Sequence, residues 1–221
     1  MAVRLELDRI NTFRRPAQIL REVSLALGEG EAICLVGRNG AGKTTTIDSI
    51  MGLLSVRSGR VAFRERDITR MPAHERALMG IGYAPEDCGI FPDLSVEENF
   101  QITAWLTAWR STARRDFDDR GFTVFPEVQG SMTGRGLHLS GGQKKMVAIT
   151  RAMSLGPSVL LLDEPFEGLA PVVVTRFIEA VRTIKSMGIS VLIAESYLIN
   201  ATRVADRALR IRRVGGDGDR R

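Results

Sequence analysis

The sequence is poor in several features that define large classes of protein. Only two of its 221 residues are cysteines, Cys34 and Cys88, and they lack the spacing of metal ligands. We therefore expect reduced thiols and neither a disulfide nor a zinc site. No apolar run reaches the roughly 18–20 residues that span a bilayer, and the first ten residues lack the apolar segment of a secretory signal. These absences predict a protein of the cytosol.

A strong excess of one charge is absent as well. The 31 basic residues exceed the 26 acidic residues by five, which gives a formal net charge of +5. Arginines between 110 and 120 are interleaved with aspartates, and the basic end at 210–221 is interrupted by glycine and aspartate. We predict a solvated helix face for the first segment and a flexible end for the second, with no nucleic acid as a partner.

Apolar residues, 44% of the chain, follow two different patterns. Residues 3–7 and 23–27 alternate between apolar and polar side chains, which is typical of strands at an antiparallel edge. Continuous apolar runs at 32–36, 159–162 and 189–194 indicate strands that are buried on both faces of a mainly parallel sheet. Helical patterns flank these runs, so the sequence predicts an α/β core with an antiparallel β edge.

The middle of the chain departs from this pattern. Residues 96–113 have the apolar spacing of a helix, which begins after Ser95, a good N-cap residue, and carries Glu97 and Glu98 in its first turn. The sequence up to Gly136 contains no run typical of a buried strand. We predict an inserted helical subdomain at 87–137 within a core made of 1–86 and 138–221.

A glycine-rich loop follows the first buried strand. Residues 37–44, GRNGAGKT, match the pattern G-x-x-x-x-G-K-S/T between that strand and a helical segment. Glycines let successive backbone N–H groups converge on phosphate oxygens, and the following helix offers the positive end of its dipole. Lys43 is expected to contact the outer phosphates, Thr44 to bind Mg²⁺ and Thr45 to support a neighbouring phosphate oxygen. The predicted nucleotide-binding residues are Gly37, Arg38, Asn39, Gly40, Ala41, Gly42, Lys43, Thr44 and Thr45.

Two carboxylates follow the second buried strand. Asp163 and Glu164 come directly after the run 159–162 and precede a proline. Because ligand sites form at the carboxyl ends of parallel strands, we expect Asp163 to hold Mg²⁺ through water. Glu164 is expected to orient or polarise the water that attacks a γ-phosphate. A solvated acidic turn is the alternative interpretation.

A third motif opens a helical segment. Residues 139–143 read LSGGQ and are followed by helical spacing through Arg151. A serine and two flexible glycines at a helix N-terminus can bind an anion. We predict a second phosphate-binding segment, the signature, made of Ser140, Gly141, Gly142 and Gln143.

The order of the three motifs resembles the ATP-binding subunit of ABC transporters, and the resemblance covers nearly the whole chain. It implies that ATP and Mg²⁺ are bound and that the signature of one subunit closes over the ATP held by another. The implied partners are a second ATP-binding subunit, in a head-to-tail homodimer or heterodimer, and integral membrane permease subunits. The implied location is the cytoplasmic face of the membrane, and the implied catalytic residues are Lys43, Glu164 and Ser196.

Shorter stretches resemble one branch of this family. Residues 83–86, 90–99 and 168–171 are similar to the ATPase of branched-chain amino acid importers and of their urea and amide relatives. This likeness implies import of branched-chain amino acids or a similar small polar solute, with an extracytoplasmic solute-binding protein as an indirect partner. Glu86 occupies a position that is Gln in most of the superfamily, and we place it with Thr44 and Asp163 near the metal.

Two positions depart from the family pattern. Ser196 stands where most members have His, and its hydroxyl is shorter than imidazole and cannot carry a positive charge, so we expect weaker support of the transition state. The family stacks adenine on an aromatic residue at a position that falls on Arg14 here. We expect Phe13 to serve instead, with stacking on the Arg14 guanidinium as one alternative and packing of Phe13 on the sheet as another.

Two other functions stay open beside a transport ATPase. Ser196 favours an ATP-gated dimerising module with weak hydrolysis. A soluble ABC ATPase that acts on DNA or ribosomes is the other alternative, although the long coiled-coil or tandem-domain insertions usual in such proteins do not fit in this chain.

Overall fold

The computed structural model describes residues 2–14, 16–108 and 119–212, which form two sheets and surrounding helices. One sheet is antiparallel, and its strands lie in the order β2 (Ala17–Gly28), β1 (Val3–Arg14), β4 (Val56–Phe63) and β5 (Arg66–Asp67). The other sheet is parallel, with the order β6 (Ile81–Ala84), β7 (Val159–Asp163), β8 (Ser190–Glu195), β3 (Ala32–Val36) and β9 (Arg207–Arg210). The predicted α/β fold with an antiparallel β edge is confirmed.

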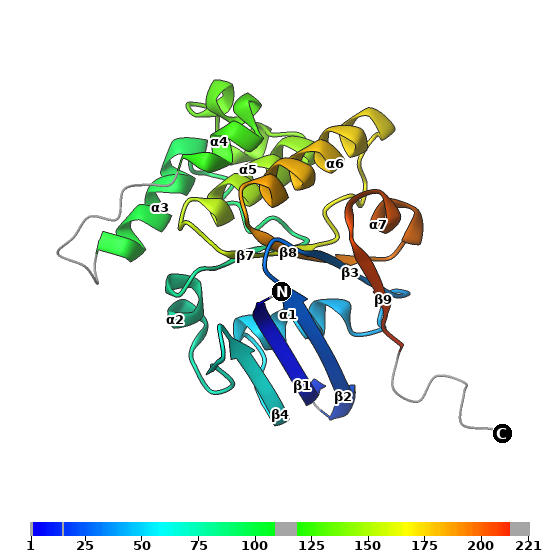
Figure 1. Ribbon diagram of the computed structural model, residues 1–221. Helices are drawn as coiled ribbons and strands as arrows, with labels where there is room; N and C mark the ends of the chain where they lie inside the picture. Colours follow the sequence, from blue (N-terminus) through cyan, green and yellow to red (C-terminus); the bar gives the residue numbers. More distant parts are fainter. Residues whose placement is uncertain (1, 15, 109–118, 213–221) are drawn as a thin grey trace.

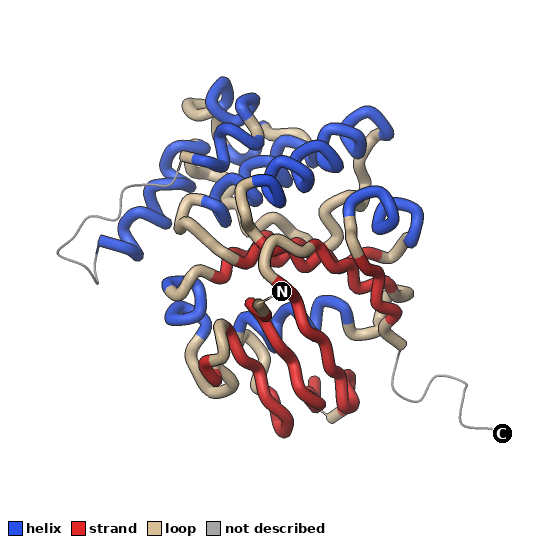
Figure 2. Tube along the Cα trace, in the orientation of Figure 1, coloured by secondary structure: helices blue, strands red, loops and turns tan. Residues whose placement is uncertain are grey.

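The helices lie in two layers around the parallel sheet. Helix α1 (Lys43–Met51) lies between the two sheets, and α2 (Ala73–Leu78) lies beside β6 (Figures 1 and 2). The opposite face is covered by the longer helices α5 (Gly141–Met153) and α6 (Pro171–Ser186) and by the shorter α7 (Leu198–Val204). Beyond α5 lie α3 (Val96–Ala108), α4 (Arg120–Val124) and two 3-10 turns, η1 (Pro126–Ser131) and η2 (Gly136–His138). None of the described helices is both long and apolar enough to cross a bilayer.

Alternate residues of β7 pack on opposite faces of the parallel sheet. Leu160 and Leu162 join the apolar cluster beneath α5 and α6. Val159 and Leu161 join the cluster formed with α1 and the antiparallel sheet. Burial on both faces explains why the strand has a continuous apolar sequence, as predicted.

The antiparallel strands are longer than the sequence pattern predicted. β1 and β2 are each 12 residues long, whereas alternation was visible only at 3–7 and 23–27. Their pairing shifts register between Leu7 and Ile10, and Arg9 and Glu22 adopt positive φ values of 45° and 49°. Such bulges reverse the side-chain alternation, so each long strand has the sequence pattern of a short one.

The described part of the middle region agrees with the helix that the sequence predicts at 96–113. α3 begins at Val96 and extends to Ala108, and Ser95 and Glu98 form the reciprocal bonds of a capping box. The predicted continuation to residue 113 lies outside the described residues, as do most of the basic segment at 110–120 and the end at 213–221. The division into a core and an inserted subdomain stays a prediction.

A buried arginine anchors the helix that follows the glycine-rich loop at residues 37–44, called the phosphate loop below. Arg76 of α2 is 2% exposed, and its guanidinium donates to the carbonyls of Ser49 (2.9 Å) and Ile50 (2.6 Å) at the carboxyl end of α1. The cation thus lies at the negative end of the helix dipole. α1 is therefore fixed at the end opposite to the loop.

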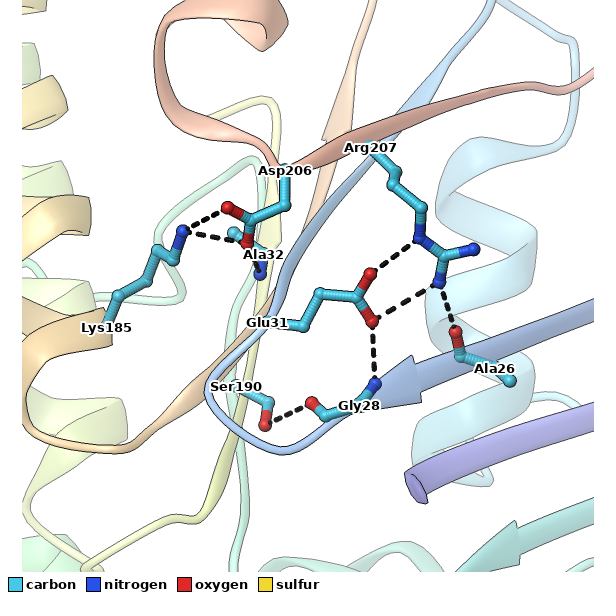
Figure 3. A network of polar contacts seen from close by, with 8 residues as sticks. All are labelled: Ala26, Gly28, Glu31, Ala32, Lys185, Ser190, Asp206 and Arg207. Atoms are coloured by element: carbon cyan, nitrogen blue, oxygen red, sulfur yellow. Dashed lines mark hydrogen bonds and ion pairs between the residues drawn. The ribbon is translucent and has the colours of Figure 1, made fainter. Parts of the chain in front are cut away.

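A second set of charges, the amino-end network, lies at the start of β3 (Figure 3) and consists of Glu31, Lys185, Asp206 and Arg207. Both carboxylate oxygens of Asp206 lie 2.7 Å from Lys185 Nζ, and one accepts the N–H of Ala32 at 2.8 Å. Glu31 accepts hydrogen bonds from Arg207 at 2.6 and 3.2 Å. The network joins β9 and α6 to the end of β3 that is opposite to the phosphate loop.

Candidate nucleotide-binding site

The phosphate loop continues from the carboxyl end of β3 into α1. Neighbouring strands hold its start on both sides, since Gly37 N–H donates to the Glu195 carbonyl at 3.2 Å and Ile211 N–H donates to the Val36 carbonyl at 2.9 Å. A Cβ at Gly37 would lie 2.8 Å from the carbonyl oxygen of Ile211. Gly42 has a φ of 107°, which L side chains rarely adopt. These two positions require glycine, so the motif spacing is a consequence of backbone geometry.

Lys43 reaches from the first residue of α1 to the ends of β7 and β8. Its Nζ donates to the Gly37 carbonyl at 2.7 Å and to Ser196 Oγ at 3.0 Å, and it lies 3.0 Å from Glu164 Oε1. The side chain is only 5% exposed. The structure therefore brings together the three residues predicted to be catalytic, which are 153 positions apart at the extremes.

Glu164 is held at both its side chain and its backbone. Ser196 binds the carboxylate twice, with Oγ 2.7 Å from Oε1 and its N–H 3.1 Å from Oε2. The backbone of Glu164 has a φ of 46°, a left-handed conformation that costs a non-glycine residue about 1–3 kcal/mol. Its N–H donates to the Ala194 carbonyl at 2.9 Å, and its carbonyl accepts from Lys145 Nζ. Surrounding contacts thus stabilise an unfavourable conformation at a proposed catalytic position.

Ser196 also contacts the phosphate loop. Its Oγ lies 2.8 Å from Asn39 Oδ1, as well as within reach of Glu164 and Lys43. A hydroxyl has one proton, so it can donate to Glu164 or to Asn39 at a given moment, while it accepts from Lys43. The residue that replaces the family's His therefore joins the phosphate loop to the end of β7.

Asp163 has an incomplete set of partners. It is 2% exposed, and neither carboxylate oxygen has a hydrogen-bond partner among the described residues. Burial raises the pKa of Asp163 to about 6, and the nearby Thr44 hydroxyl moderates the rise without reaching hydrogen-bond geometry. An unpartnered carboxylate beside a hydroxyl is a donor set that suits Mg²⁺ completed by water and phosphate oxygens.

Glu86 is less closely associated with this pair. Its side chain is exposed, and its charge is one of the smaller influences that raise the pKa of Asp163. The described part of the chain contains no group of three acidic, His or Cys side chains arranged to hold a metal. Thr44 and Asp163 therefore fit a metal better than a set that includes Glu86, whose role stays a prediction.

The signature forms the exposed start of α5. Ser140 caps the helix through a capping box, in which Gln143 N–H donates to Ser140 Oγ at 3.3 Å and Ser140 N–H donates to Gln143 Oε1 at 2.9 Å. Gly141 is exposed, and a Cβ there would meet nothing within 4 Å. This glycine is therefore not required by packing within the chain.

The two candidates for stacking on adenine are engaged differently. The Arg57 guanidinium lies over the Phe13 ring, 4.9 Å from its centroid. Arg14 forms an ion pair with Asp48 of α1 at 2.6 Å. One face of Phe13 is thus covered, and its role as the adenine platform stays a prediction.

Two charged residues of the site were not identified from the sequence. Glu195 is 1% exposed and accepts the Phe166 N–H at 3.0 Å, and burial raises its pKa to about 7. The sequence signal that could have identified Glu195 is its position directly after the buried run 189–194. Lys145 bonds to the Glu164 carbonyl, but nothing in the sequence distinguished it from the adjacent Lys144.

Comparison with known proteins agrees with this geometry. The family model described as ABC transporter matches residues 20–167. Lipopolysaccharide export ATP-binding proteins LptB of Acidithiobacillus ferridurans and Escherichia coli are 33% and 34% identical to this chain, covering 86% of it in both cases and 78% and 79% of their own lengths. BraG of Pseudomonas aeruginosa, a high-affinity branched-chain amino acid transport ATP-binding protein, is 31% identical over 92% of this chain and 87% of its own.

Solved structures give the same result. MJ1267, an ATP-binding cassette in its ADP conformation, is 26% identical and superposes with a TM-score of 0.80, covering 96% of this chain and 88% of its own. The sequence relatives include exporters as well as the amino acid transporter, so they do not single out the branched-chain amino acid branch that the sequence favoured. The matched motifs, the fold and the relatives agree on the wider family: the chain belongs to the ABC transporter family as an ATP-binding subunit, an ATPase that works in transport.

Proposed function

We propose that this chain binds ATP through residues 37–45, hydrolyses it with Glu164 and thereby drives a membrane permease. The observation that carries the proposal is the meeting of Lys43, Glu164 and Ser196 at the carboxyl ends of three parallel strands. Ligand sites in open α/β sheets form at this edge.

Each side chain has a specific task in this proposal. Lys43 exchanges its contacts with Glu164 and Ser196 for the outer phosphates of ATP. Glu164, released from Lys43, accepts a hydrogen bond from the attacking water, and the Ser196 N–H and hydroxyl keep its carboxylate in place. Mg²⁺ bound by Thr44 and Asp163 supplies positive charge to the phosphate oxygens.

The signature supports a second part of the proposal, a head-to-tail dimer. Residues 140–143 lie at an exposed helix N-terminus, where a second subunit could present its nucleotide. MJ0796, 19% identical with a TM-score of 0.80, is a cassette whose structure is described as dimeric. We place two such subunits against integral permease subunits at the cytoplasmic face of the membrane.

Gel filtration tests the dimer. The Glu164→Gln variant with Mg-ATP should elute as a dimer, because it retains ATP but hydrolyses it slowly, whereas ADP should leave it monomeric. Ser140→Arg in the same background should remain monomeric while it still binds ATP. A Glu164→Gln protein that stays monomeric at saturating Mg-ATP would count against ATP sites that are shared between two subunits.

For the substrate, we propose import of a branched-chain amino acid or a similar small polar solute, with a solute-binding protein outside the membrane. The likeness to BraG supports this choice, and the likeness to LptB supports lipopolysaccharide export as a second candidate. The test is ATPase activity after reconstitution with the permeases encoded beside the gene. Stimulation by an amino acid-loaded binding protein supports import, and stimulation by lipopolysaccharide supports export.

A further inference from the structure

We propose that Lys145 is a positioning residue for ATP hydrolysis, which ties the signature helix to the backbone of Glu164. The inference rests on the proposed role of Glu164. It concerns a side chain that the phosphate-loop, metal and signature motifs do not include.

Lys145 reaches across from the second turn of α5 to the end of β7. Its Nζ donates a hydrogen bond to the main-chain carbonyl of Glu164. Lys43 contacts the carboxylate of the same residue. Two lysines from different helices therefore hold Glu164 at its opposite ends, and only Lys43 lies in the phosphate loop.

The carbonyl of Glu164 lies where the chain turns sharply. With a φ of 46°, Glu164 leaves the direction of β7, and its carbonyl also accepts the Glu167 N–H at 3.2 Å. The ammonium of Lys145 adds a charge-assisted bond, the stronger type, to this turn. Loss of that bond leaves the left-handed conformation with less support, so the carboxylate is positioned by its Ser196 contacts alone once Lys43 turns to ATP.

The surroundings of Lys145 distinguish it from a surface lysine. It lines a small pocket with Asp163 and Pro165 at the end of β7 and with Ala84 and Pro85 at the end of β6. Burial raises the pKa of Glu195, and the charge of Lys145 opposes that rise. The ammonium is thus placed among the acidic residues of the site, whereas the adjacent Lys144 has no side-chain hydrogen bond or ion pair among the described contacts.

This contact connects the signature helix directly to the turn at Glu164 in the same chain. Ser140 caps the same helix that presents Lys145 to Glu164. A helix is stiff over so short a distance, so a shift at its N-terminus moves the Lys145 side chain as well. Errors of about 1 Å in the position of a catalytic group reduce rates by up to about 100-fold.

Steady-state ATP hydrolysis by three variants tests the inference. We expect Lys145→Met to lower kcat by about 10-fold or more with KM for ATP changed by less than about twofold, since the phosphate loop is intact. Lys145→Arg should recover most of the rate because it restores a cationic donor. Lys144→Met, on the same helix, is the matched control and should resemble the wild type.

Binding of a non-hydrolysable ATP analogue and thermal unfolding are measured for each variant. If Lys145→Met loses its fold, Lys145→Gln replaces it, and the same split between kcat and KM is expected with a smaller loss. A kcat within twofold of wild type, or a loss of analogue affinity as large as the loss of rate, overturns the inference. Absence of turnover in the wild type, or turnover unchanged in Glu164→Gln, refutes the proposed function itself.

Discussion

The two ends of the parallel sheet carry charge networks of opposite design. At the amino end, the pKa values of Glu31 and Asp206 lie below their ordinary values, because hydrogen bonds from Arg207, Lys185 and main-chain N–H groups outweigh burial. At the carboxyl end, burial raises the pKa values of Asp163 and Glu195 to about 6 and about 7. The first network favours charged carboxylates, whereas burial at the second end disfavours the charged forms of Asp163 and Glu195.

The difference separates a structural role from a functional one. Exposed and fully paired charges contribute about 0–1 kcal/mol each and are screened by salt. Buried groups without partners are expensive and persist where a ligand completes them. The carboxyl end has the unpartnered Asp163 and the left-handed Glu164, two of the features on which the proposed nucleotide site rests.

The largest effect on stability should come from neutralising Glu195. A folded-state pKa raised from 4.5 to about 7 means that the folded protein binds the proton more tightly than the unfolded chain. The tighter proton binding stabilises the folded protein. This stabilisation is full below about pH 4.5 and is lost as the pH rises through about 7. We expect Glu195→Gln to exceed the wild type in stability by about 3 kcal/mol at pH 8.5, where the wild-type carboxylate is charged.

Urea unfolding at several pH values checks this prediction. The two proteins should be nearly equal in stability at pH 4.5, because the protonated carboxyl of Glu195 and the amide that replaces it in the variant are both neutral and can both accept the Phe166 N–H. If the free energies of unfolding of the two proteins differ by a constant amount from pH 4.5 to 8.5, the fold does not disfavour the charged form of Glu195.

A smaller effect is expected on catalysis from Ser196. Ser196→Ala removes the hydroxyl that binds Glu164, Asn39 and Lys43 but keeps the main-chain N–H that binds Glu164. Loss of one hydrogen bond to a charged group, about 1.5 kcal/mol, corresponds to a fall in kcat of about 10-fold. Ser196→Thr retains the hydroxyl and is the control. Equal turnover by all three proteins would remove Ser196 from the catalytic arrangement.

The smallest effect should come from the amino end. Asp206→Asn weakens an ion pair whose Asp side chain is 48% exposed, so we expect a loss of less than about 1 kcal/mol in the free energy of unfolding. Because the folded-state pKa of Asp206 is lowered, its contribution is present above the ordinary pKa and disappears as the pH falls through the folded value. ATP turnover should stay unchanged. A fall in turnover would show that the amino-end network affects catalysis at the carboxyl end of the sheet.

The sequence predicted the elements of this fold whose local pattern is strong. Glycine spacing located the phosphate loop because Gly37 and Gly42 have geometry that other residues cannot adopt, and runs buried on both faces located β3 and β7. The full lengths of β1 and β2 were missed because bulges reverse the alternation.

The long-range contacts of the site were harder to predict. Lys43, Glu164 and Ser196 were grouped through family resemblance, since only the order of the strands in the sheet brings them together. Lys145 has the same local pattern as Lys144, and its contact depends on how α5 crosses the end of β7. Tertiary packing, which local sequence does not encode, decides such choices.

ATP turnover by the wild type and by Glu164→Gln, measured side by side with saturating Mg-ATP, tests the central claim most directly. The exposed neighbour Glu167, changed to Gln, serves as the control in the same turn. The account predicts steady turnover by the wild type and the control, and a loss of at least about 100-fold in Glu164→Gln with ATP binding retained. Turnover by Glu164→Gln at the wild-type rate would contradict the account, because the carboxylate at the carboxyl end would then have no part in hydrolysis.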